Sequence, residues 1–245
     1  MRKIKAGESR EFHIILKSPV FQFVEAYKSL RTNLKFISMN NKYKKIIITS
    51  ALPNEGKSNI AINLAISLSE SGSKVLIVDT DLRKPRTHEY LHIKDGKKSG
   101  VTSILSGSAE FKDCMVRFTD LGVDVLPSGP IPPNPTEMIG SEAMKKLIES
   151  LEKSYDYVIF DTPPASVVTD AAVLSKFTDG IIFVIRQKYA TLEQIKEAKK
   201  SLENVQANII GSVLNDYDST KNSKYGGSGS GLGYSYKYAY EYSEK

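Results

Sequence analysis

The sequence has a single cysteine and no long apolar run, and both shortages limit what the protein can be. Cys114 alone cannot form an internal disulfide, and we expect it to be a small buried apolar residue. The longest apolar runs, such as Gly180–Ile185, are far shorter than the roughly 18 residues that a membrane-spanning helix needs. The basic N-terminus is not followed by the apolar stretch of a signal peptide. We therefore expect a cytoplasmic protein.

The net charge of +6 is concentrated at one end of the 245-residue chain. Residues 1–45 carry 11 Lys or Arg and 3 Glu, a balance of +8, so the remainder is slightly acidic. A basic leading segment can attract anionic lipid headgroups or nucleic acid, and it can equally be a solvated surface beside a helix. The overall composition is ordinary for one large soluble α/β domain.

Apolar runs alternate with helical patterns along most of the chain. Ser18 and Pro19 suit the start of a basic amphipathic helix, whose apolar residues recur at helical spacing as far as Ile37. Strands that are continuously apolar and separated by helices indicate a mostly parallel sheet with helices on both faces. We predict strands at 45–49, 74–79, 123–126, 157–161, 180–185 and 208–214, and further helices at 58–69, 142–153 (capped by Ser141) and 191–205.

These patterns divide the chain into a basic N-terminal segment (1–17), one domain (18–215) and a C-terminal tail (216–245). Beyond residue 224 the tail holds glycine, serine and tyrosine but almost no aliphatic residue apart from Leu232. So few apolar side chains cannot offset the entropy of ordering a chain, and we expect the tail to be flexible.

A phosphate-binding loop is predicted between the first strand and the helix at 58–69. Residues 51–58, ALPNEGKS, fit the P-loop spacing, except that Ala51 replaces the first glycine. Backbone N–H groups of the loop and the helix N-terminus would point at the phosphates. Lys57 would add charge near the β and γ phosphates, and Ser58 would offer a hydroxyl to Mg²⁺. The predicted nucleotide-binding residues here are Pro53, Asn54, Glu55, Gly56, Lys57, Ser58 and Asn59.

Carboxylates follow two of the predicted strands, at the ends where ligands bind in open α/β sheets. Asp79 and Asp81 follow the strand at 74–79, and Asp161 ends the strand at 157–161. Three acidic residues near triphosphate oxygens require a shielding cation, so we predict a site for ATP with Mg²⁺. Asn215, after the last strand, is either a hydrogen-bonding partner of the base edge or a turn residue.

Residues 88–92, HEYLH, have the H-E-x-x-H pattern of zinc metalloproteases, in which two histidines one helical turn apart share a metal. The context argues against a protease, because the segment follows Asp81 by seven residues and the only other histidine is the distant His13. We interpret His88 and His92 as packing or surface residues beside the nucleotide site.

Six of the 13 tyrosines lie in the last 21 residues, and five of them alternate at every second position. The alternation fits one face of a half-buried strand, a low-complexity tail without a role, or exposed phosphoacceptors on a tether that reaches the active site of a neighbouring subunit. Phosphates, each adding about −1.5 to −2 charges, would repel one another and act as an assembly switch. The six residues are Tyr225, Tyr234, Tyr236, Tyr238, Tyr240 and Tyr242.

Four features together resemble the bacterial tyrosine kinases (BY-kinases) of capsule and exopolysaccharide synthesis. They are the P-loop at 51–58, the sequence VDTDLR ending at Arg83, the sequence FDTPP ending at Pro164 and the tyrosine cluster. The resemblance runs from about Phe23 to the C-terminus. The second acidic motif and the tyrosine cluster separate this family from related cell-division and partition ATPases, whose early P-loop lysine has no counterpart near Leu52.

The resemblance implies a three-layer P-loop NTPase fold of the MinD/ParA type and ATP-dependent phosphorylation of protein tyrosine. Lys57 would bind and activate the phosphates, while Ser58 and Asp161 would hold Mg²⁺. Asp79 would support the metal shell, and Asp81 would accept the proton of the acceptor tyrosine or orient its hydroxyl.

The family also phosphorylates itself between the subunits of a ring, to which a helical E-x-x-R-x-x-R motif contributes. Here the motif is Glu25, Lys28 and Arg31, and lysine at its centre loses the bidentate pairing of arginine, which puts ring stability in question. Asn54 stands where the family usually has glycine, and asparagine tolerates the left-handed backbone angles expected there.

The resemblance implies partners as well. As a version without membrane spans, the chain would be recruited to the inner face of the plasma membrane by a transmembrane activator (a polysaccharide co-polymerase) whose cytoplasmic tail completes the site. A phosphotyrosine phosphatase would be a further partner, and no nucleic acid is expected. The alternatives are a MinD/ParA-like positioning ATPase that acts as a switch at membrane or DNA, and a regulatory scaffold with a degraded site, which the intact Lys57 and Asp161 disfavour.

Overall fold

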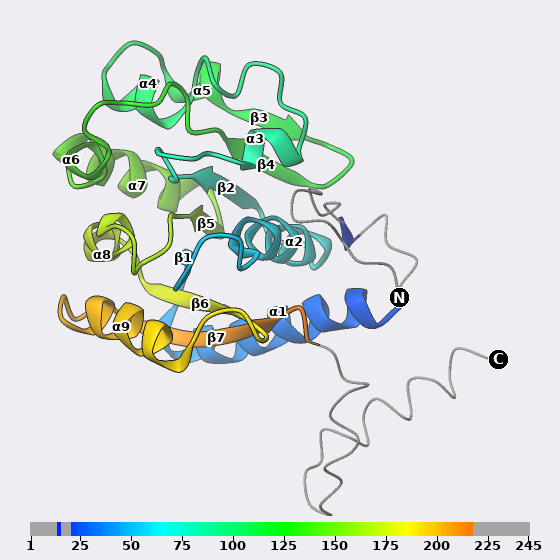
Figure 1. Ribbon diagram of the computed structural model, residues 1–245. Coiled ribbons are helices and arrows are strands. Elements are labelled where there is room, and N and C mark those ends of the chain that lie inside the picture. Colours follow the sequence, from blue (N-terminus) through cyan, green and yellow to red (C-terminus); the bar gives the residue numbers. More distant parts are fainter. Residues whose placement is uncertain (1–13, 16–20, 218–245) are drawn as a thin grey trace, which may run out of the picture. The chain divides into compact units, whose positions relative to one another are not determined.

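A seven-stranded sheet with helices on both faces forms the centre of the molecule (Figure 1). The structure, a computed structural model, describes residues 14–15 and 21–217. The strand order is β3–β4–β2–β5–β1–β6–β7, and all neighbouring strands are parallel except β3 and β4. The strands are β1 (Lys45–Ser50), β2 (Val75–Asp79), β3 (Val116–Phe118), β4 (Val123–Leu126), β5 (Tyr157–Asp161), β6 (Gly180–Arg186) and β7 (Ile209–Asn215).

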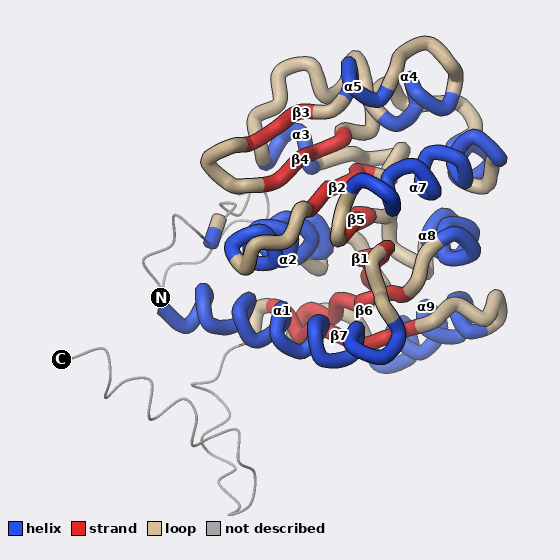
Figure 2. Tube along the Cα trace, turned by 180° about the vertical axis from the view of Figure 1, so that it is seen from behind, coloured by secondary structure: helices blue, strands red, loops and turns tan. Residues whose placement is uncertain are grey.

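Helices cover both faces of this sheet (Figure 1 and Figure 2). The helix α2 follows β1 directly, and α1 packs beside α2 on the same face, whereas α7, α8 and α9 cover the other. The described helices are α1 (Phe21–Asn41), α2 (Lys57–Glu70), α3 (Thr87–Tyr90), α4 (Val101–Leu105), α5 (Phe111–Cys114), α6 (Pro135–Ile139), α7 (Glu142–Ser154), α8 (Asp170–Leu174), η2 (Ser175–Phe177) and α9 (Leu192–Glu203).

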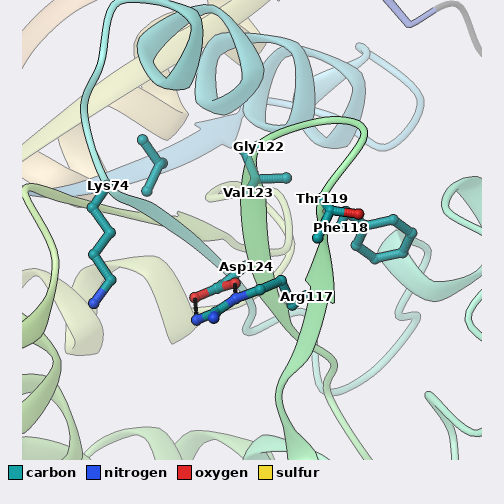
Figure 3. A pocket seen from close by; sticks show the side chains of 8 residues that line it. Lys74, Arg117, Phe118, Thr119, Gly122, Val123 and Asp124 are labelled. Carbon is teal, nitrogen blue, oxygen red and sulfur yellow. Dashed lines mark hydrogen bonds and ion pairs between the residues drawn. The ribbon is translucent and has the colours of Figure 1, made fainter.

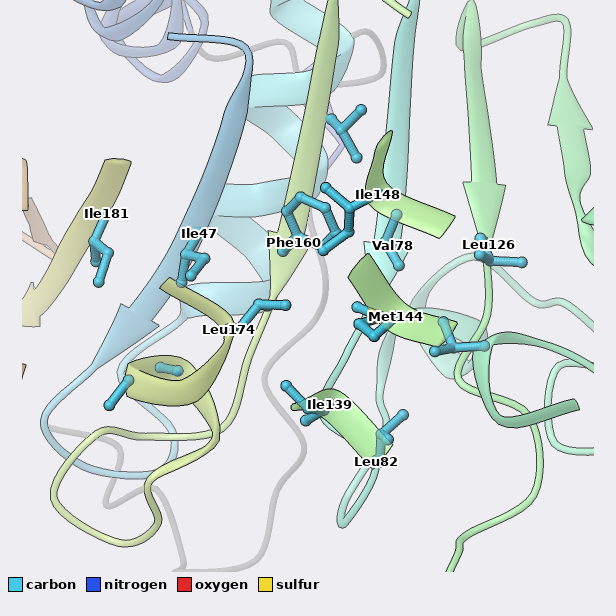
Figure 4. Packing of buried hydrophobic residues seen from close by; sticks show 14 of the residues in the cluster. Ile47, Val78, Leu82, Leu126, Ile139, Met144, Ile148, Phe160, Leu174 and Ile181 are labelled. Carbon is cyan, nitrogen blue, oxygen red and sulfur yellow. The ribbon is translucent and has the colours of Figure 1, made fainter. Parts of the chain in front are cut away.

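Alternation along the central strands divides the apolar core into two clusters. Ile47 of β1 and Phe160 of β5 belong to the cluster beneath α7, α8 and α9, where Met144 packs with them (Figure 4). Ile46 and Ile48, the neighbours of Ile47, belong to the cluster beneath α1 and α2. Because both faces are covered, the ends of the parallel strands are left for ligands.

The predicted fold and all six predicted strands are confirmed, with boundaries shifted by at most one residue. The predicted helix starts at Ser141 and Thr191 are confirmed too, since each hydroxyl accepts a hydrogen bond from the N–H three residues on, Met144 and Gln194. Cys114 is buried, as expected. The strand β3 and the short helices α3, α4, α5, α6, α8 and η2 were not predicted.

Three further expectations concern residues that lie wholly or mostly outside the described part of the chain: the helix start at Ser18, the basic segment 1–17 apart from residues 14–15, and the tail beyond residue 217. The division of the chain at residues 17 and 215 stays a prediction. In the part that the structure describes, no helix combines the length and the apolar character needed to cross a membrane.

Candidate active site

The loop between β1 and α2 has the backbone conformation of an anion-binding turn. Asn54 (φ 63°) and Gly56 (φ 92°) both have left-handed angles, so the expectation for Asn54 is confirmed. The helix α2 begins at Lys57, immediately after Gly56. The first N–H groups of α2 therefore open onto the carboxyl edge of the sheet, where phosphates bind in folds of this kind.

The carboxylates meet at this same edge because β2 and β5 are neighbours. Asp79 and Asp161 are direct partners in the parallel register, and each is no more than 1% exposed. Asp81 is 5% exposed, and its Oδ2 lies 3.5 Å from the ammonium of Lys57. One lysine and three carboxylates, all predicted as site residues, thus occupy one small buried region.

The two oxygens of Asp79 are both used within the protein. Its Oδ1 accepts a hydrogen bond from the N–H of Asp81 and its Oδ2 accepts one from the N–H of Thr87, each at 3.2 Å. Asp79 thereby holds the turn that carries Asp81. Thr87 was not predicted from the sequence, because its contact with Asp79 is made by the backbone and no residue type signals it.

Asp161, by contrast, keeps one oxygen without a partner. Its Oδ1 is buried and has no hydrogen-bond partner among the described residues. The hydroxyl of Thr87 lies 3.5 Å from Oδ2, and Ser58 lies within hydrogen-bonding reach of the carboxylate. A buried, unsatisfied carboxylate oxygen beside a P-loop hydroxyl needs a further ligand.

Crowding of like charges shifts the pKa values at this site. Burial, together with the neighbouring Asp161 and Asp81, raises the pKa of Asp79 well above its ordinary value. Burial also raises the pKa of Asp161, to about 6, although Lys57 and Ser58 oppose the shift. The pKa of Lys57 is raised, because the attraction of the three carboxylates outweighs its burial. The cluster has an excess of negative charge that a cation would relieve.

A divalent cation bound together with phosphates fits this arrangement. Mg²⁺ prefers oxygen ligands and completes its octahedron with phosphate oxygens and water. The free Oδ1 of Asp161 and the hydroxyl of Ser58 are suitable donors from the protein. Within residues 14–15 and 21–217, no three His, Cys, Asp or Glu side chains could hold a metal alone, so phosphates would have to supply part of the shell.

Comparison with known proteins identifies the family. Residues 43–215 match the family described as AAA domain. The tyrosine-protein kinase YwqD of Bacillus subtilis (strain 168) is 37% identical over 226 residues, which cover 92% of this chain and 94% of YwqD. This chain belongs to the bacterial tyrosine kinases. The putative tyrosine-protein kinase CapB of Staphylococcus aureus is 32% identical over 82% of this kinase and 87% of its own length.

Solved structures agree with the membership of this kinase in the family. The kinase domain of the Escherichia coli tyrosine kinase ETK matches with a TM-score of 0.78 and 32% identity, over 87% of this chain and 84% of that one. The chimerical protein CapA2B2 matches with a TM-score of 0.75 and 38% identity, over 81% and 85%. The septum site-determining protein MinD of Pyrococcus horikoshii OT3, complexed with Mg-ADP, matches with a TM-score of 0.59 and 26% identity, over 71% of this chain and 70% of that one. The predicted family and the MinD/ParA-like fold are thus confirmed.

The matched share of a relative's own length differs from one relative to another. It spans only 28% of the tyrosine-protein kinase etk of Escherichia coli (strain K12), to which it is 33% identical. It therefore corresponds to one part of that longer protein.

Three of the predicted nucleotide-binding side chains have partners within the kinase. The carboxylate of Glu55 accepts hydrogen bonds from the N–H groups of Leu52 (2.7 Å) and Arg186 (3.2 Å). The Oδ1 of Asn59 accepts one from the hydroxyl of Tyr27 in α1 (3.0 Å). The Nδ2 of Asn215 donates one to the carbonyl of Glu55 (2.8 Å). Direct contacts of these side chains with nucleotide stay predictions.

The three residues of the E-x-x-R-x-x-R motif lie on α1 but do not have the same surroundings. Glu25 and Lys28 pair with each other at 2.7 Å, and both side chains are more than 40% exposed. Arg31 instead donates from Nη1 to the carbonyl of Ser67 in α2, at 2.7 Å. Arg31 therefore fastens α1 to α2 inside the subunit, a role that the sequence did not reveal.

The histidine pair of the H-E-x-x-H pattern is not arranged for a shared metal. His88 lies in α3, which ends at Tyr90, and His92 lies beyond it with a left-handed φ of 54°. His88 is buried and its pKa is lowered, chiefly by burial, whereas His92 is exposed. The single helix that would align the two rings is not formed.

A separate pocket of about 310 Å³ lies at the amino ends of β2 and β4, opposite the nucleotide loop (Figure 3). The guanidinium of Arg117 donates to both oxygens of Asp124 (2.8 and 3.0 Å), and the hydroxyl of Tyr155 donates to Asp124 Oδ2 (2.8 Å). The ammonium of Lys74 lies 4.8 Å from the ring centre of Tyr155. Arg117 and Asp124 are thus paired with each other, whereas the ammonium of Lys74 lies over an aromatic ring.

Proposed function

We propose that this bacterial tyrosine kinase uses ATP to phosphorylate the tyrosine cluster of its own C-terminal tail, between subunits, and so regulates the synthesis and export of a capsular polysaccharide or exopolysaccharide. The proposal rests on one observation: the side chains of Lys57, Asp81 and Asp161 lie close together, beside the turn at Asn54–Gly56. Family membership supports the reaction, and the names of YwqD and CapB support tyrosine as its acceptor.

The nucleotide would be held mainly through its phosphates. N–H groups of the loop and of the first turn of α2 would donate to phosphate oxygens, and Lys57 would place its ammonium near the β and γ phosphates. Ser58 and Asp161 would hold Mg²⁺, with Asp161 Oδ1 as the available carboxylate oxygen. The bound ion would neutralise charge on the phosphoryl group.

Asp81 is the candidate for handling the acceptor proton. Its Oδ1 accepts a hydrogen bond from the N–H of Lys84 (3.0 Å), while Oδ2 faces the ammonium of Lys57. As the tyrosine oxygen bonds to the γ-phosphorus and the bond to the β–γ bridging oxygen breaks, the phenolic proton would pass to Asp81, and ADP would leave. Asp79 would act indirectly, by fixing the turn that carries Asp81 and by supporting the metal shell.

The acceptors and partners are part of the same proposal. The tail begins at residue 216, directly after Asn215, whose side chain contacts the P-loop. The exposed Glu25 and Lys28 on α1 suit an interface between copies. A transmembrane activator would recruit the kinase to the inner face of the membrane, and a phosphatase would remove the phosphates. The proposed acceptors are Tyr225, Tyr234, Tyr236, Tyr238, Tyr240 and Tyr242.

Mass spectrometry of the tail, before and after incubation with ATP, Mg²⁺ and a peptide of the activator's cytoplasmic tail, tests the proposal. We expect phosphate on several tail tyrosines of the wild type and none on Lys57→Met, which lacks the ammonium at the phosphates. ATP hydrolysis without any phosphotyrosine would reject the proposal and favour a positioning ATPase of the MinD kind.

A further inference from the structure

The last residues of β6 and β7 donate hydrogen bonds to backbone carbonyls of the nucleotide loop. Arg186 ends β6 and Asn215 ends β7, and the two are partners in the parallel register. The guanidinium of Arg186 donates from Nη1 to the carbonyl of Asn54 at 3.2 Å, and it lies 4.8 Å from the ring centre of Tyr189. Asn215 donates from Nδ2 to the carbonyl of Glu55 at 2.8 Å. Two consecutive carbonyls of the loop are thus held from the side of the sheet edge.

The side chain of Glu55 adds a third connection between the loop and the end of β6. It is fully buried, and its two oxygens accept hydrogen bonds from the N–H groups of Leu52 (2.7 Å) and Arg186 (3.2 Å). A buried carboxylate whose two oxygens both accept backbone N–H groups is held by the fold. Glu55 therefore ties the start of the loop to the end of β6.

Gly56 allows Asn215 to approach so closely. A Cβ atom at Gly56 would lie 2.1 Å from Asn215 Nδ2, so no side chain fits between them. The left-handed φ of Gly56 is a second reason for glycine at this position. The amide of Asn215 is therefore packed directly on the backbone of the loop.

These contacts fix the direction of the loop's N–H groups. In a planar trans peptide the N–H points opposite to the carbonyl of the same unit. When Arg186 and Asn215 hold the carbonyls of Asn54 and Glu55 outward, the N–H groups of Glu55 and Gly56 are turned away from those strand ends. Successive N–H groups aimed to one side form an anion-binding nest.

We propose that Glu55, Arg186 and Asn215 form a loop latch, whose members are positioning residues for the triphosphate of ATP. Asn215 accordingly acts on phosphate binding through the loop, and not on the base edge. The inference rests on the proposed nucleotide site and specifies what keeps that site in its binding conformation. Since every nucleoside triphosphate has the same phosphates, the latch acts equally on all of them.

Binding of ATP, GTP and inorganic triphosphate, measured by calorimetry in the presence of Mg²⁺, separates a role in the latch from a role in base recognition. We expect Asn215→Ala to weaken the binding of all three ligands by the same factor, about tenfold, as for loss of one partly buried hydrogen bond. The same change at the exposed C-cap of α9, Asn204→Ala, should leave all three affinities unchanged. Weaker ATP binding with unchanged triphosphate binding would overturn the latch and restore base recognition.

Glu55→Gln provides a second test, in which two explanations predict opposite signs. If Glu55 acted only through its charge, its neutralisation near the phosphates would tighten triphosphate binding. The latch predicts weaker binding by about tenfold, because an amide replaces one of two acceptor oxygens and turns its NH₂ toward a backbone donor. Thermal unfolding without ligand, followed by circular dichroism, checks that Asn215→Ala and Glu55→Gln are both folded. Equal or tighter binding by Glu55→Gln would overturn the latch, whereas a wild type that binds none of the three ligands would overturn the proposed function itself.

Discussion

At the scale of single residues, the three carboxylates at the strand ends differ in what their oxygens contact. Both oxygens of Asp79 accept backbone N–H groups, an oxygen of Asp81 faces Lys57, and one oxygen of Asp161 is buried without a partner among the described residues. The same chemical group thus holds a turn at Asp79, pairs with an ammonium at Asp81 and keeps one oxygen without a partner among the described residues at Asp161. Position along the sequence alone would not separate these tasks.

The unpaired oxygen of Asp161 leads to a prediction about pH and stability. Its pKa is raised from 3.8 to about 6 in the folded protein, so the stability that its proton provides is complete below about pH 4 and is lost as pH rises through about 6. Asp161→Asn stays neutral at every pH. In the absence of ligand it should unfold at a higher temperature than the wild type at pH 7.5, by roughly 2–4 °C for each kcal/mol of relieved burial cost.

Differential scanning calorimetry between pH 4 and pH 8 checks this prediction. The gap between variant and wild type should widen as pH rises, while kcat of the variant falls by about 100-fold because the cation loses a ligand. A variant that is less stable than the wild type at pH 7.5 would show that Asp161 does not bear an unfavourable charge.

Residue type also decides how much of the site could be predicted. Lys57, Ser58 and Asp161 could be proposed from the sequence because a P-loop and a carboxylate after a buried strand have recognisable patterns. The contacts of the Arg186 and Thr87 backbone N–H groups were missed, since any residue except proline can donate such a bond. The contact of the Arg186 guanidinium with the carbonyl of Asn54 was missed too, because it joins segments 132 residues apart. The role of Glu55 was missed because the loop spacing gives no information on whether its side chain turns inward.

At the scale of elements, α1 is joined to α2 and its C-cap by polar contacts from every fourth residue of α1. Tyr27 donates to Asn59, Arg31 to Ser67 and Lys35 to Ser71, at 3.0, 2.7 and 2.8 Å. Residues four apart lie on one face of a helix, so these contacts fix one register between the helices. Because α2 begins at the phosphate-binding loop, the position of α1 is linked to the nucleotide site.

Arg31→Ala should therefore weaken the subunit itself. Loss of a hydrogen bond from a charged group should lower the free energy of unfolding by about 1–2 kcal/mol, as measured by urea denaturation of the monomer. Lys28→Ala is the matched control, since Lys28 has a partly exposed ion pair with Glu25 and should change stability by less than about 0.5 kcal/mol. Unchanged stability of Arg31→Ala, with self-association lost, would make Arg31 an inter-subunit residue only.

Element length explains what the sequence could and could not predict of the fold. The central strands are buried on both faces, so β1 and β5 stand out as continuous apolar runs. Helices such as α3 and α8, with 4 and 5 residues, are too short to show helical periodicity. The three-residue β3 forms only because it pairs antiparallel with β4.

At the scale of the whole molecule, the site and the tail are joined at one residue. Asn215 ends the last strand, contacts the P-loop and precedes the segment that contains six tyrosines. We propose these tyrosines as the acceptors within an assembly of copies. Phosphates on several tyrosines would add negative charge to every copy and favour separation of the subunits.

Transfer from one copy to the tail of another tests the central claim most directly. The donor is the kinase with all six tail tyrosines changed to phenylalanine, and the acceptor is Lys57→Met with its tail intact. Mass spectrometry of the mixture with ATP, Mg²⁺ and the activator peptide should find phosphotyrosine on the tail of the Lys57→Met chain, with none when either chain is incubated alone. Absence of phosphate from that tail, while the wild type phosphorylates its own, would contradict phosphorylation between subunits.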